Sequence, residues 1–193
     1  MGQSYTEGKT FDKEDFTRQP LGKGDYENCV FNQCDFSNSD LSDIRFATCE
    51  FVGCNLSLAK LTKTALQDII FRDCKMLGLQ LEYCNEFGLS IGFENCSLNH
   101  ASFYKLKLHK TVFKNVQLQE VDFSECDLTD SVFDHCDLAG ATFDHTNLEK
   151  ADLRTTFNYS IDPEINRIKK AKFSLQGVSG LLDKYNIVID KTM

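Results

Sequence analysis

The chain contains no tryptophan, only two prolines, and no apolar run that approaches the ~20 residues of a transmembrane helix. We therefore expect no membrane-spanning segment. The first residues, Met1 to Tyr5, lack the basic stretch and apolar core of a signal peptide, so we expect a cytoplasmic protein. Positive charge is scarce as well, because 21 Lys and Arg residues face 29 Asp and Glu residues, a net charge of −8. Nucleic acid and membrane surfaces repel a chain of this charge, and we expect neither as a partner.

Motifs of catalysis and of metal binding are also missing. The sequence has no glycine-rich nucleotide-binding loop, no Gly-x-Ser-x-Gly elbow and no Cys-x-x-Cys pair. Its four histidines stand at polar positions and lack the spacing of metal ligands: His100, His109, His135 and His145. We therefore expect no cofactor, no metal site and no enzymatic activity.

The sequence does contain a period of five residues. At 41% hydrophobic residues and 193 residues in length, the chain has a globular composition. Large apolar residues recur every five positions from Phe11 to Leu81, and again, after a slip of two residues near 82–92, from Phe93 to Leu153. We call these 28 positions the centres. Thirteen of the sixteen phenylalanines are centres, so the spacing is the main organising feature of the chain.

A second position, two residues before each centre, is occupied mostly by small or β-branched residues. All nine cysteines share this inward position: Cys29, Cys34, Cys49, Cys54, Cys74, Cys84, Cys96, Cys126 and Cys136. We expect small, buried, reduced thiols, because the count is odd and no export signal is visible. Cys34, Cys54 and Cys74 are each twenty residues apart and would stack within reach of a disulfide, so distance alone does not exclude a bridge.

A period of five matches neither the 3.6 residues of a helical turn nor the alternation of a strand. It does match a coil with straight sides, in which five residues form one side and one corner. The two apolar positions then point inward and the three polar positions point outward. At a spacing of twenty residues like residues would stack, such as Phe11, Phe31, Phe51 and Phe71, which favours four sides per coil.

These residues resemble the pentapeptide-repeat family, whose consensus is A-(D/N)-L-x-x. Segments such as Cys34-Asp35-Phe36, Cys126-Asp127-Leu128 and Ala151-Asp152-Leu153 follow it closely. The resemblance implies an all-β solenoid, a right-handed quadrilateral parallel β-helix with about seven coils of four pentapeptides. We expect residues 1–10 to be a lead-in, residues 11–153 to be the β-helix, and residues 154–193 to be an α-helical cap.

The expected cap begins at Asp162-Pro163-Glu164, which has the order of an N-cap, a first helical residue and an acidic first turn. Ser174 would cap a second helix, and residues 185–189 are predicted to be a short strand. The tail resembles that of the microcin B17 immunity and quinolone-resistance branch of the family, in which this segment dimerises. The residues implied in a homodimer are Ile165, Ile168, Leu181, Leu182, Ile187 and Ile189. A monomeric cap is the alternative.

Acidic residues concentrate between positions 120 and 152, where ten carboxylates are opposed only by Lys150, a net charge of −9. Six of them are expected on two adjacent sides: Asp122, Glu125, Asp127, Asp130, Asp144 and Glu149. The resemblance implies a DNA mimic that binds a type II topoisomerase, DNA gyrase or topoisomerase IV, and protects it from microcin-type or quinolone-type inhibitors. The long loops of the quinolone-protecting relatives are missing, so the immunity-type relatives are nearer.

Two other interpretations of these charges remain open. Asp or Asn directly before a centre belongs to the repeat and often supports the coil, so the acids could simply keep the protein soluble. Alternatively, the chain is a structural scaffold that binds another protein through its mildly basic middle, from Lys60 to Lys114.

Overall fold

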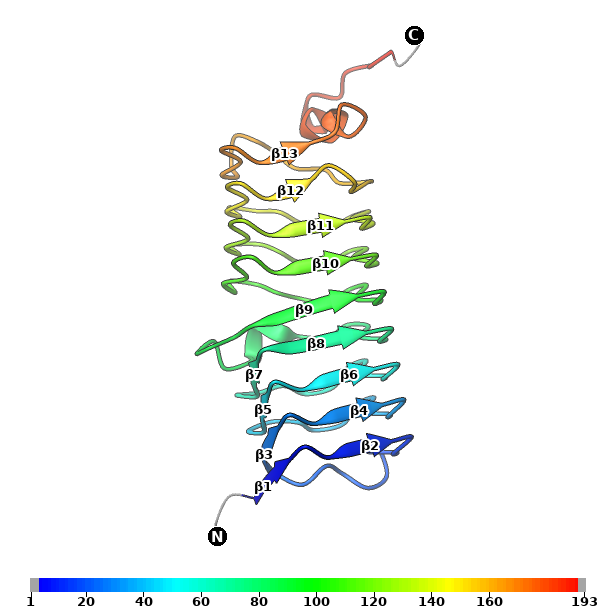
Figure 1. Ribbon diagram of the computed structural model, residues 1–193. Coiled ribbons are helices and arrows are strands. Elements are labelled where there is room, and N and C mark those ends of the chain that lie inside the picture. Colours follow the sequence, from blue (N-terminus) through cyan, green and yellow to red (C-terminus); the bar gives the residue numbers. More distant parts are fainter. Residues whose placement is uncertain (1–3, 191–193) are drawn as a thin grey trace.

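The computed structural model describes residues 4–190, and these form a stack of parallel coils (Figure 1). Two sheets run along the stack, and every strand pairing in them is parallel. The larger sheet has nine strands: β2 (Thr10–Asp12), β4 (Val30–Asn32), β6 (Glu50–Val52), β8 (Ile69–Arg72), β9 (Ile91–Glu94), β10 (Val112–Lys114), β11 (Val132–Asp134), β12 (Asp152–Leu153) and β13 (Lys172–Phe173). The smaller sheet has four: β1 (Ser4–Glu7), β3 (Gly24–Glu27), β5 (Arg45–Ala47) and β7 (Ala65–Gln67).

The coils have four sides. Strand partners in both sheets are twenty residues apart over most of the rod, and two further rows of β-bridges follow the same spacing, such as Asp15 with Asp35 and Ser102 with Asp122. We number the sides in chain order from the nine-stranded sheet, side 1, so that the four-stranded sheet is on side 4. We number the coils from Phe11: coils 1 to 8 begin at residues 11, 31, 51, 71, 93, 113, 133 and 153.

The phase slip predicted near 82–92 is an insertion of two residues at one corner. Ala65 pairs with Asn85, twenty residues later, whereas Ile69 pairs with Ile91, twenty-two residues later. The extra residues therefore lie between Asn85 and Ile91, directly after the 3₁₀ turn η1 (Leu81–Tyr83). Phe87 in this insertion is 82% exposed. All later coils return to the twenty-residue register, so the insertion leaves the stack above it unchanged.

The core is a set of vertical columns of inward-pointing centres. On side 1, Phe11, Phe31, Phe51, Phe71, Phe93, Phe113 and Phe133 stack with ring centroids 4.7–5.5 Å apart. The column on side 3 continues from leucines below to Phe103, Phe123 and Phe143, with centroids 5.1 and 5.3 Å apart. Rings of the columns on sides 1 and 3 meet edge to face across the core, as aromatic pairs prefer. The predicted inward positions are confirmed.

Where the residue two positions before a centre is Cys, Ser or Thr, it often has a second role as a hydrogen-bond donor. Its side chain reaches the carbonyl of a centre in the coil below, as Cys136 Sγ does to Phe113 O at 3.3 Å and Thr64 Oγ1 does to Leu41 O at 2.9 Å. Ser39, Thr146 and Thr156 donate in the same way. A buried carbonyl without a partner costs free energy, so this position favours small residues that can donate, among them Cys, Ser and Thr.

Corners require a left-handed backbone. Most residues two positions after a centre have a positive φ, between 51° and 63° for the non-glycine residues, and they are mostly Asn, Asp, Lys, His and Gly. These residue types tolerate this region better than β-branched residues do. Thr48, with φ of 51°, is the one β-branched residue at such a corner in residues 4–190.

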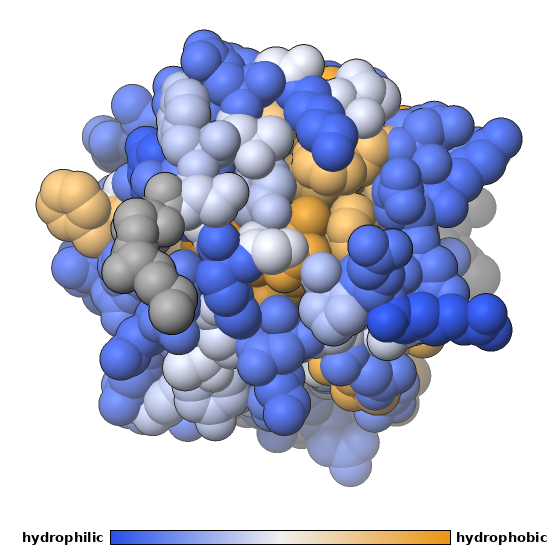
Figure 2. All heavy atoms as spheres, turned by 90° about the horizontal axis from the view of Figure 1, so that it is seen from below, coloured by the Kyte–Doolittle hydropathy of each residue, from blue (hydrophilic) through white to orange (hydrophobic). Residues whose placement is uncertain are grey.

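The two ends of the rod differ. At the N-terminal end the first ring of the core is nearly covered, since Phe11, Phe16, Leu21 and Tyr26 are 5–8% exposed. Viewed along the rod from this end, apolar atoms are visible at the centre of a polar rim (Figure 2). Pro20 occupies the position before a centre in coil 1, where higher coils donate a backbone N–H downward, as Lys60 does to Ser39. Because Pro has no N–H, this edge carries one donor fewer.

The prediction of an α-helical cap is wrong, because the described part of this segment, residues 154–190, contains no α-helix. Residues 154–173 form a further coil, in which Phe173 of β13 pairs with Leu153 of β12 and Arg167 bridges to Asn147. The chain does turn at Asp162, where Asp162 Oδ1 accepts from Glu164 N at 2.9 Å, but it makes a single turn and no helix follows. Asn166 then donates to the carbonyl of Phe143 at 2.9 Å, as residues at the inward position do in lower coils. Hydrogen bonds to the open coil below override the local helix signal.

The chain then closes the C-terminal end with two short 3₁₀ turns, η2 (Val178–Leu181) and η3 (Asp183–Tyr185). Ser174 does cap this segment, since its Oγ accepts from Gly177 N at 3.0 Å. Gly177 and Gly180 lie so close to Tyr159 that a Cβ at either position would collide with it. The contact with Tyr159 leaves no room for the side chains of a regular helix at these two positions. Residues 185–189 form no strand.

The core columns make a testable prediction. Phe123 is fully buried between Phe103 and Phe143, so Phe123→Ala should leave a cavity and lower the free energy of unfolding by ~3–5 kcal/mol in urea titrations. Phe87→Ala is the matched control, because it makes the same change at an exposed ring and should have little effect. An unchanged stability for Phe123→Ala would contradict the column.

The corners make another prediction. Thr48→Asn should stabilise the protein by about 1 kcal/mol, because Asn adopts the left-handed backbone with less strain than a β-branched residue. Thermal unfolding would show a rise of about 2–4 °C in Tm for a chain of this size. Thr62→Asn, one position earlier in its repeat and outside the left-handed region, should not show the rise. A lower Tm for Thr48→Asn would show that strain at this corner is absent.

Candidate partner-binding surface

The six acids predicted to bind a partner lie together on coils 6 and 7, and we call them the acidic surface. Asp122, Glu125 and Asp144 lie on side 3, while Asp127, Asp130 and Glu149 lie on side 4. The stacking is direct: Glu125 N donates to Asp144 O at 2.7 Å, and Asp130 N donates to Glu149 O at 3.0 Å. The structure therefore places these residues on two adjacent sides, as the twenty-residue register predicts.

Two members of the acidic surface also support the coil. Asp122 Oδ1 accepts from Ser124 N at 2.8 Å, and Asp127 Oδ1 accepts from Thr129 N at 3.1 Å. The same turn recurs along the rod where Asp or Asn precedes a centre, for example at Asp35 and Asn55. Reversing the charge at Asp122 or Asp127 would therefore also disturb the backbone, and asparagine is the better substitution at these two positions.

Five of the six carboxylates contact a basic side chain. Glu125 lies 3.5 Å from Lys105 Nζ, Asp130 lies 3.9 Å from Lys150 Nζ, and Glu149 lies 2.7 Å from an Arg167 guanidinium nitrogen. Histidines provide the other two contacts, at 2.7 Å each: His109 with Asp127 and His145 with Asp144. Most of these pairs are strongly exposed, so each contributes little to stability and can exchange partners readily.

Basic rows border the acidic surface above and below. Lys105, Lys107, His109 and Lys110 lie one coil below it, and Arg167, Lys169 and Lys170 lie one coil above it on side 4. A count over residues 120–152 misses these cations because they are about eighteen residues away in sequence. The twenty-residue register, applied to the basic residues as well as to the acidic ones, would have found them.

Asp127 is partly buried, with 31% of its side chain exposed. Partial desolvation acts to raise the pKa of its carboxyl group, but hydrogen bonds from Thr129 and the contact with His109 outweigh it. The net effect lowers the pKa of Asp127 below its usual value of 3.8. Asn147 Nδ2 also donates to Asp127 Oδ1, at 3.0 Å, so one carboxylate joins two coils.

The other four acids of the 120–152 stretch lie elsewhere. Glu120 and Asp137 are on side 2, where Glu120 contacts His100 at 3.1 Å and Asp137 accepts from Gln119 at 2.7 Å. Asp134 and Asp152 are on side 1, and a bidentate contact with Arg154 lowers the pKa of Asp152 to about 2. The charge of this stretch is thus distributed around the whole rod.

The residues predicted for dimerisation fall into two groups. Ile168 and Leu181 pack partly buried against the core, and Leu182 is half-buried. Ile165, Ile187 and Ile189 are 44%, 56% and 41% exposed. Val188, between the last two, is 97% exposed. Their contribution to a dimer stays a prediction.

The cysteines all point into the core as free thiols. Burial raises the pKa of the Cys126 and Cys136 thiols to about 12, which disfavours the reactive thiolate. Within residues 4–190, no group of three or more His, Cys, Asp or Glu side chains is arranged to hold a metal ion. No helix in the same part of the chain is long and apolar enough to cross a membrane.

A family model described as "Pentapeptide repeat region" matches residues 25–86 and 90–159, more than half of the sequence. The chain belongs to the pentapeptide-repeat family. The break in the family match, residues 87–89, lies at the corner between Asn85 and Ile91 that holds the two-residue insertion. The pentapeptide repeat therefore accounts for both segments of the rod, with the insertion as the interruption.

Solved structures of other pentapeptide-repeat proteins are similar. QnrB1, a plasmid-mediated fluoroquinolone resistance protein, is 22% identical, with a TM-score of 0.48 over 97% of this chain and 98% of that chain. HetL of Nostoc sp. strain PCC 7120, involved in the regulation of heterocyst differentiation, is 13% identical, with a TM-score of 0.42 over 90% and 85%. At these values the similarity carries no information on function. A comparison with curated proteins found no significant match.

Asp127 provides a test of the acidic surface. Because its folded pKa is below its unfolded pKa, its contribution to stability is present above about pH 4 and is lost as the pH falls through the folded pKa. Asp127→Asn should therefore lower stability at pH 7 and show a smaller loss than wild type between about pH 5 and pH 2, in urea midpoints. Asp43→Asn, which removes an exposed corner acid, is the control. Parallel curves for Asp127→Asn and wild type would contradict the coupling.

Proposed function

We propose that this protein is a non-enzymatic, cytoplasmic binding protein that docks its acidic surface into the DNA-binding groove of a type II topoisomerase. The observation that supports this most is the placement of six carboxylates on two adjacent sides of a straight rod. The partner would be DNA gyrase or topoisomerase IV, and occupancy of the groove would protect it from an inhibitor of the microcin or quinolone type.

The density of charge supports a local mimic of DNA. Two coils occupy about 10 Å of the rod axis at ~4.8 Å per parallel strand. Six carboxylates over this length give roughly one charge per 1.6 Å, close to the ~1.7 Å of duplex DNA. The basic rows on both sides confine the similarity to coils 6 and 7. The mimic is thus a short patch, and the rest of the rod acts as its support.

The exposed cations do not prevent such docking. Lys105, Lys150 and Arg167 are 55–67% exposed in their pairs with the acidic surface. Ion pairs of this kind contribute about 0–1 kcal/mol, so a groove with many fixed cations could replace them. Long-range attraction between the groove and this surface would then increase the rate of association at low salt.

The tail supports a homodimer as part of the proposal. Segment 160–168 is the part of the sequence that resembles the gyrase-protecting branch, and it lies directly above the acidic surface. Exposed Ile165, Ile187, Val188 and Ile189 provide apolar surface at this end of the rod. A two-fold contact here would place the acidic surfaces of both copies near the centre of a longer rod.

A neutralised variant tests the mechanism. Glu125→Gln, Asp130→Asn and Asp144→Asn together remove three charges from residues outside the aspartate turns, so the fold should be preserved. We expect at least ~10-fold weaker binding to purified gyrase and a flatter salt dependence, because fewer charges are matched on docking.

The control variant is Asp12→Asn, Asp43→Asn and Asp68→Asn, which changes the net charge equally on coils 1–3. It should bind like wild type. Equal weakening by both triple variants would mean that net charge, not the acidic surface, determines binding. Failure of the wild-type protein to bind gyrase or topoisomerase IV, or to relieve inhibition of supercoiling, would reject the proposed partner and favour a scaffold role.

A further inference from the structure

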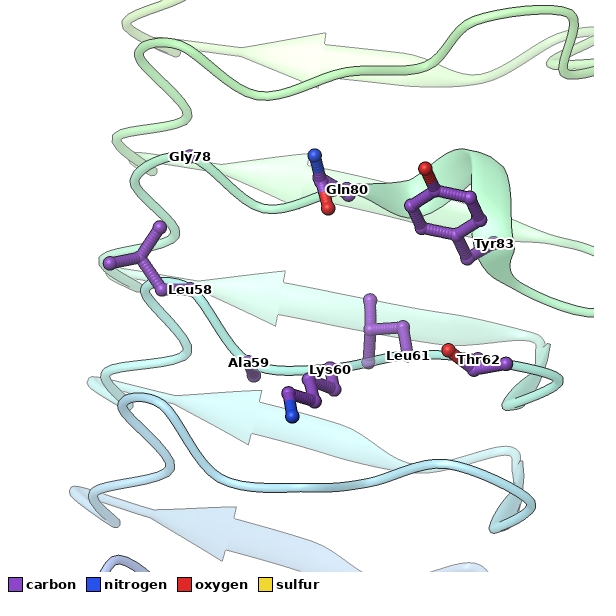
Figure 3. A pocket seen from close by; sticks show the side chains of 8 residues that line it. All are labelled: Leu58, Ala59, Lys60, Leu61, Thr62, Gly78, Gln80 and Tyr83. Carbon is purple, nitrogen blue, oxygen red and sulfur yellow. The ribbon is translucent and has the colours of Figure 1, made fainter.

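Exposed apolar side chains gather on side 3 and at its corner with side 2, in the middle of the rod and far from the tail. Leu58, Tyr83 and Tyr104 are 59%, 55% and 36% exposed. Between coils 3 and 4 a shallow trough of about 410 Å³ crosses this side, with Leu58 at one end and Tyr83 at the other (Figure 3). Leu58 and Tyr83 belong to neither the core nor the acidic surface, whereas the Tyr104 hydroxyl donates to Glu125 Oε1 at 2.9 Å. Together the three side chains form an exposed apolar area.

Charge on side 3 changes sign along the rod, and Asp40 and Asp43 of coil 2 lie directly below Lys60 and Lys63 of coil 3. Lys60 and Lys63 on coil 3 form no ion pair within residues 4–190. Asp122 and Glu125 lie on coil 6 of the same side. Lys60 and Asp122 both occupy the position before a centre, and Lys63 and Glu125 both occupy the corner position after it. The two charged pairs therefore stand in the same two columns, three coils apart.

We propose that side 3 is a self-association surface on which a second copy of the chain packs antiparallel. In this arrangement coil 3 of one copy lies opposite coil 6 of the other, and coil 4 lies opposite coil 5. The two-fold axis lies in the interface and is perpendicular to the rod. Such an axis inverts the order of the coils but keeps each column opposite itself, as an isologous contact requires.

The residues that this register brings together are complementary. Lys60 faces Asp122 and Lys63 faces Glu125, each twice by symmetry. Tyr83 faces Lys105, a cation–π pair, and Gln80 faces Ser102, a hydrogen-bonding pair. The ring of Tyr104 from the second copy lies over the trough. Within one chain, Lys105 Nζ already lies 4.7 Å from the centroid of the Tyr104 ring, so this ammonium group makes a cation–π contact in the single chain as well.

Placing coil 3 opposite coil 2 would set Lys60 and Lys63 against Asp40 and Asp43, but only coils 1–4 of each copy would then overlap. Other registers centred on the middle of the rod are electrostatically poorer. A shift of one coil places coil 3 opposite coil 7 and coil 5 opposite itself. Lys105 then faces Lys105 of the second copy, and Lys63 faces His145. Among the registers that centre on the middle of the rod, only the favoured one opposes both free lysines with carboxylates. Side 3 thus carries both halves of a charge-complementary contact, which is why a second copy fits it better than an unrelated partner does.

The expected interface is small. Six facing coils span about 29 Å at ~4.8 Å per coil, and a side with its corner residues is roughly 20 Å wide. The buried surface is then on the order of 1,200 Å² for both copies, the lower limit for specific association. The dimer should therefore be weak and sensitive to salt. It also covers Asp122 and Glu125, so self-association and docking through the acidic surface exclude each other.

Sedimentation equilibrium from about 1 to 200 μM tests the proposal. In the Ile187→Asp background, which removes the apolar tail contact, the mass should pass from about 22.0 kDa toward twice that value at about 50 mM NaCl and stay near the monomer value to higher concentration at about 500 mM. Lys63→Glu and Glu125→Lys should each weaken association at least ~10-fold, since each change alters two symmetric contacts. The double variant Lys63→Glu/Glu125→Lys restores opposite charges and should return to within about threefold of wild type.

Two controls separate this contact from the others. Lys75→Glu reverses a charge on side 2 and should leave association unchanged. Ile187→Asp removes apolar surface from the tail and should also leave the salt-sensitive association unchanged. A wild type that stays monomeric at low salt, single variants that associate normally, or a double variant that fails to recover would each overturn the proposal. So would association that responds only to Ile187→Asp, because the tail would then be the contact.

Discussion

The backbone of each coil is hydrogen-bonded to the coils above and below it, and the rest of the structure depends on this vertical pairing. Side chains serve the same purpose at several main-chain carbonyls, to which Cys136, Thr64 and Asn166 donate. The pairing fixes the twenty-residue register, and the register places phenylalanine on phenylalanine in the core. Local sequence preferences matter mainly at the corners, where the backbone must become left-handed.

The same register defines the neighbours of each charge on the surface. Asp127 contacts His109, eighteen residues earlier, and Glu149 contacts Arg167, eighteen residues later. Linear charge counts therefore exaggerate the acidity of a segment, because its nearest cations belong to other coils. Side 3 shows a different effect, since Lys60 and Lys63 form no ion pair within residues 4–190 although Asp40 and Asp43 lie one coil below them. Charge on a solenoid is best described by columns and sides.

Much of the fold could be predicted from the sequence because one repeating pattern encodes both burial and register. The centres, the inward cysteines and the position of the slip followed from counting in fives and twenties. The cap could not be predicted in this way. Asp162-Pro163-Glu164 is a good helix start, but the open coil beneath it offered backbone partners that a helix would leave unpaired. Asn166, at the donor position of the repeat, was the residue that signalled one more coil.

The placement of the six acids was also predictable, because stacking on two sides follows from the period alone. Their cationic neighbours were not considered, although the same arithmetic contains them. The apolar area formed by Leu58, Tyr83 and Tyr104 gave no signal in sequence, because large residues at outward positions look like ordinary variation until the coils are stacked.

The two extra residues between Asn85 and Ile91 show how this architecture accommodates a change in length. The bonds that hold a coil run to its neighbours, so an added segment bulges from one corner while the strands before and after it stay in step. An insertion that would shift every contact of a helix bundle changes only one corner of this rod. New peptide can thus be gained at a corner and selected for recognition while the rod that presents it remains the same.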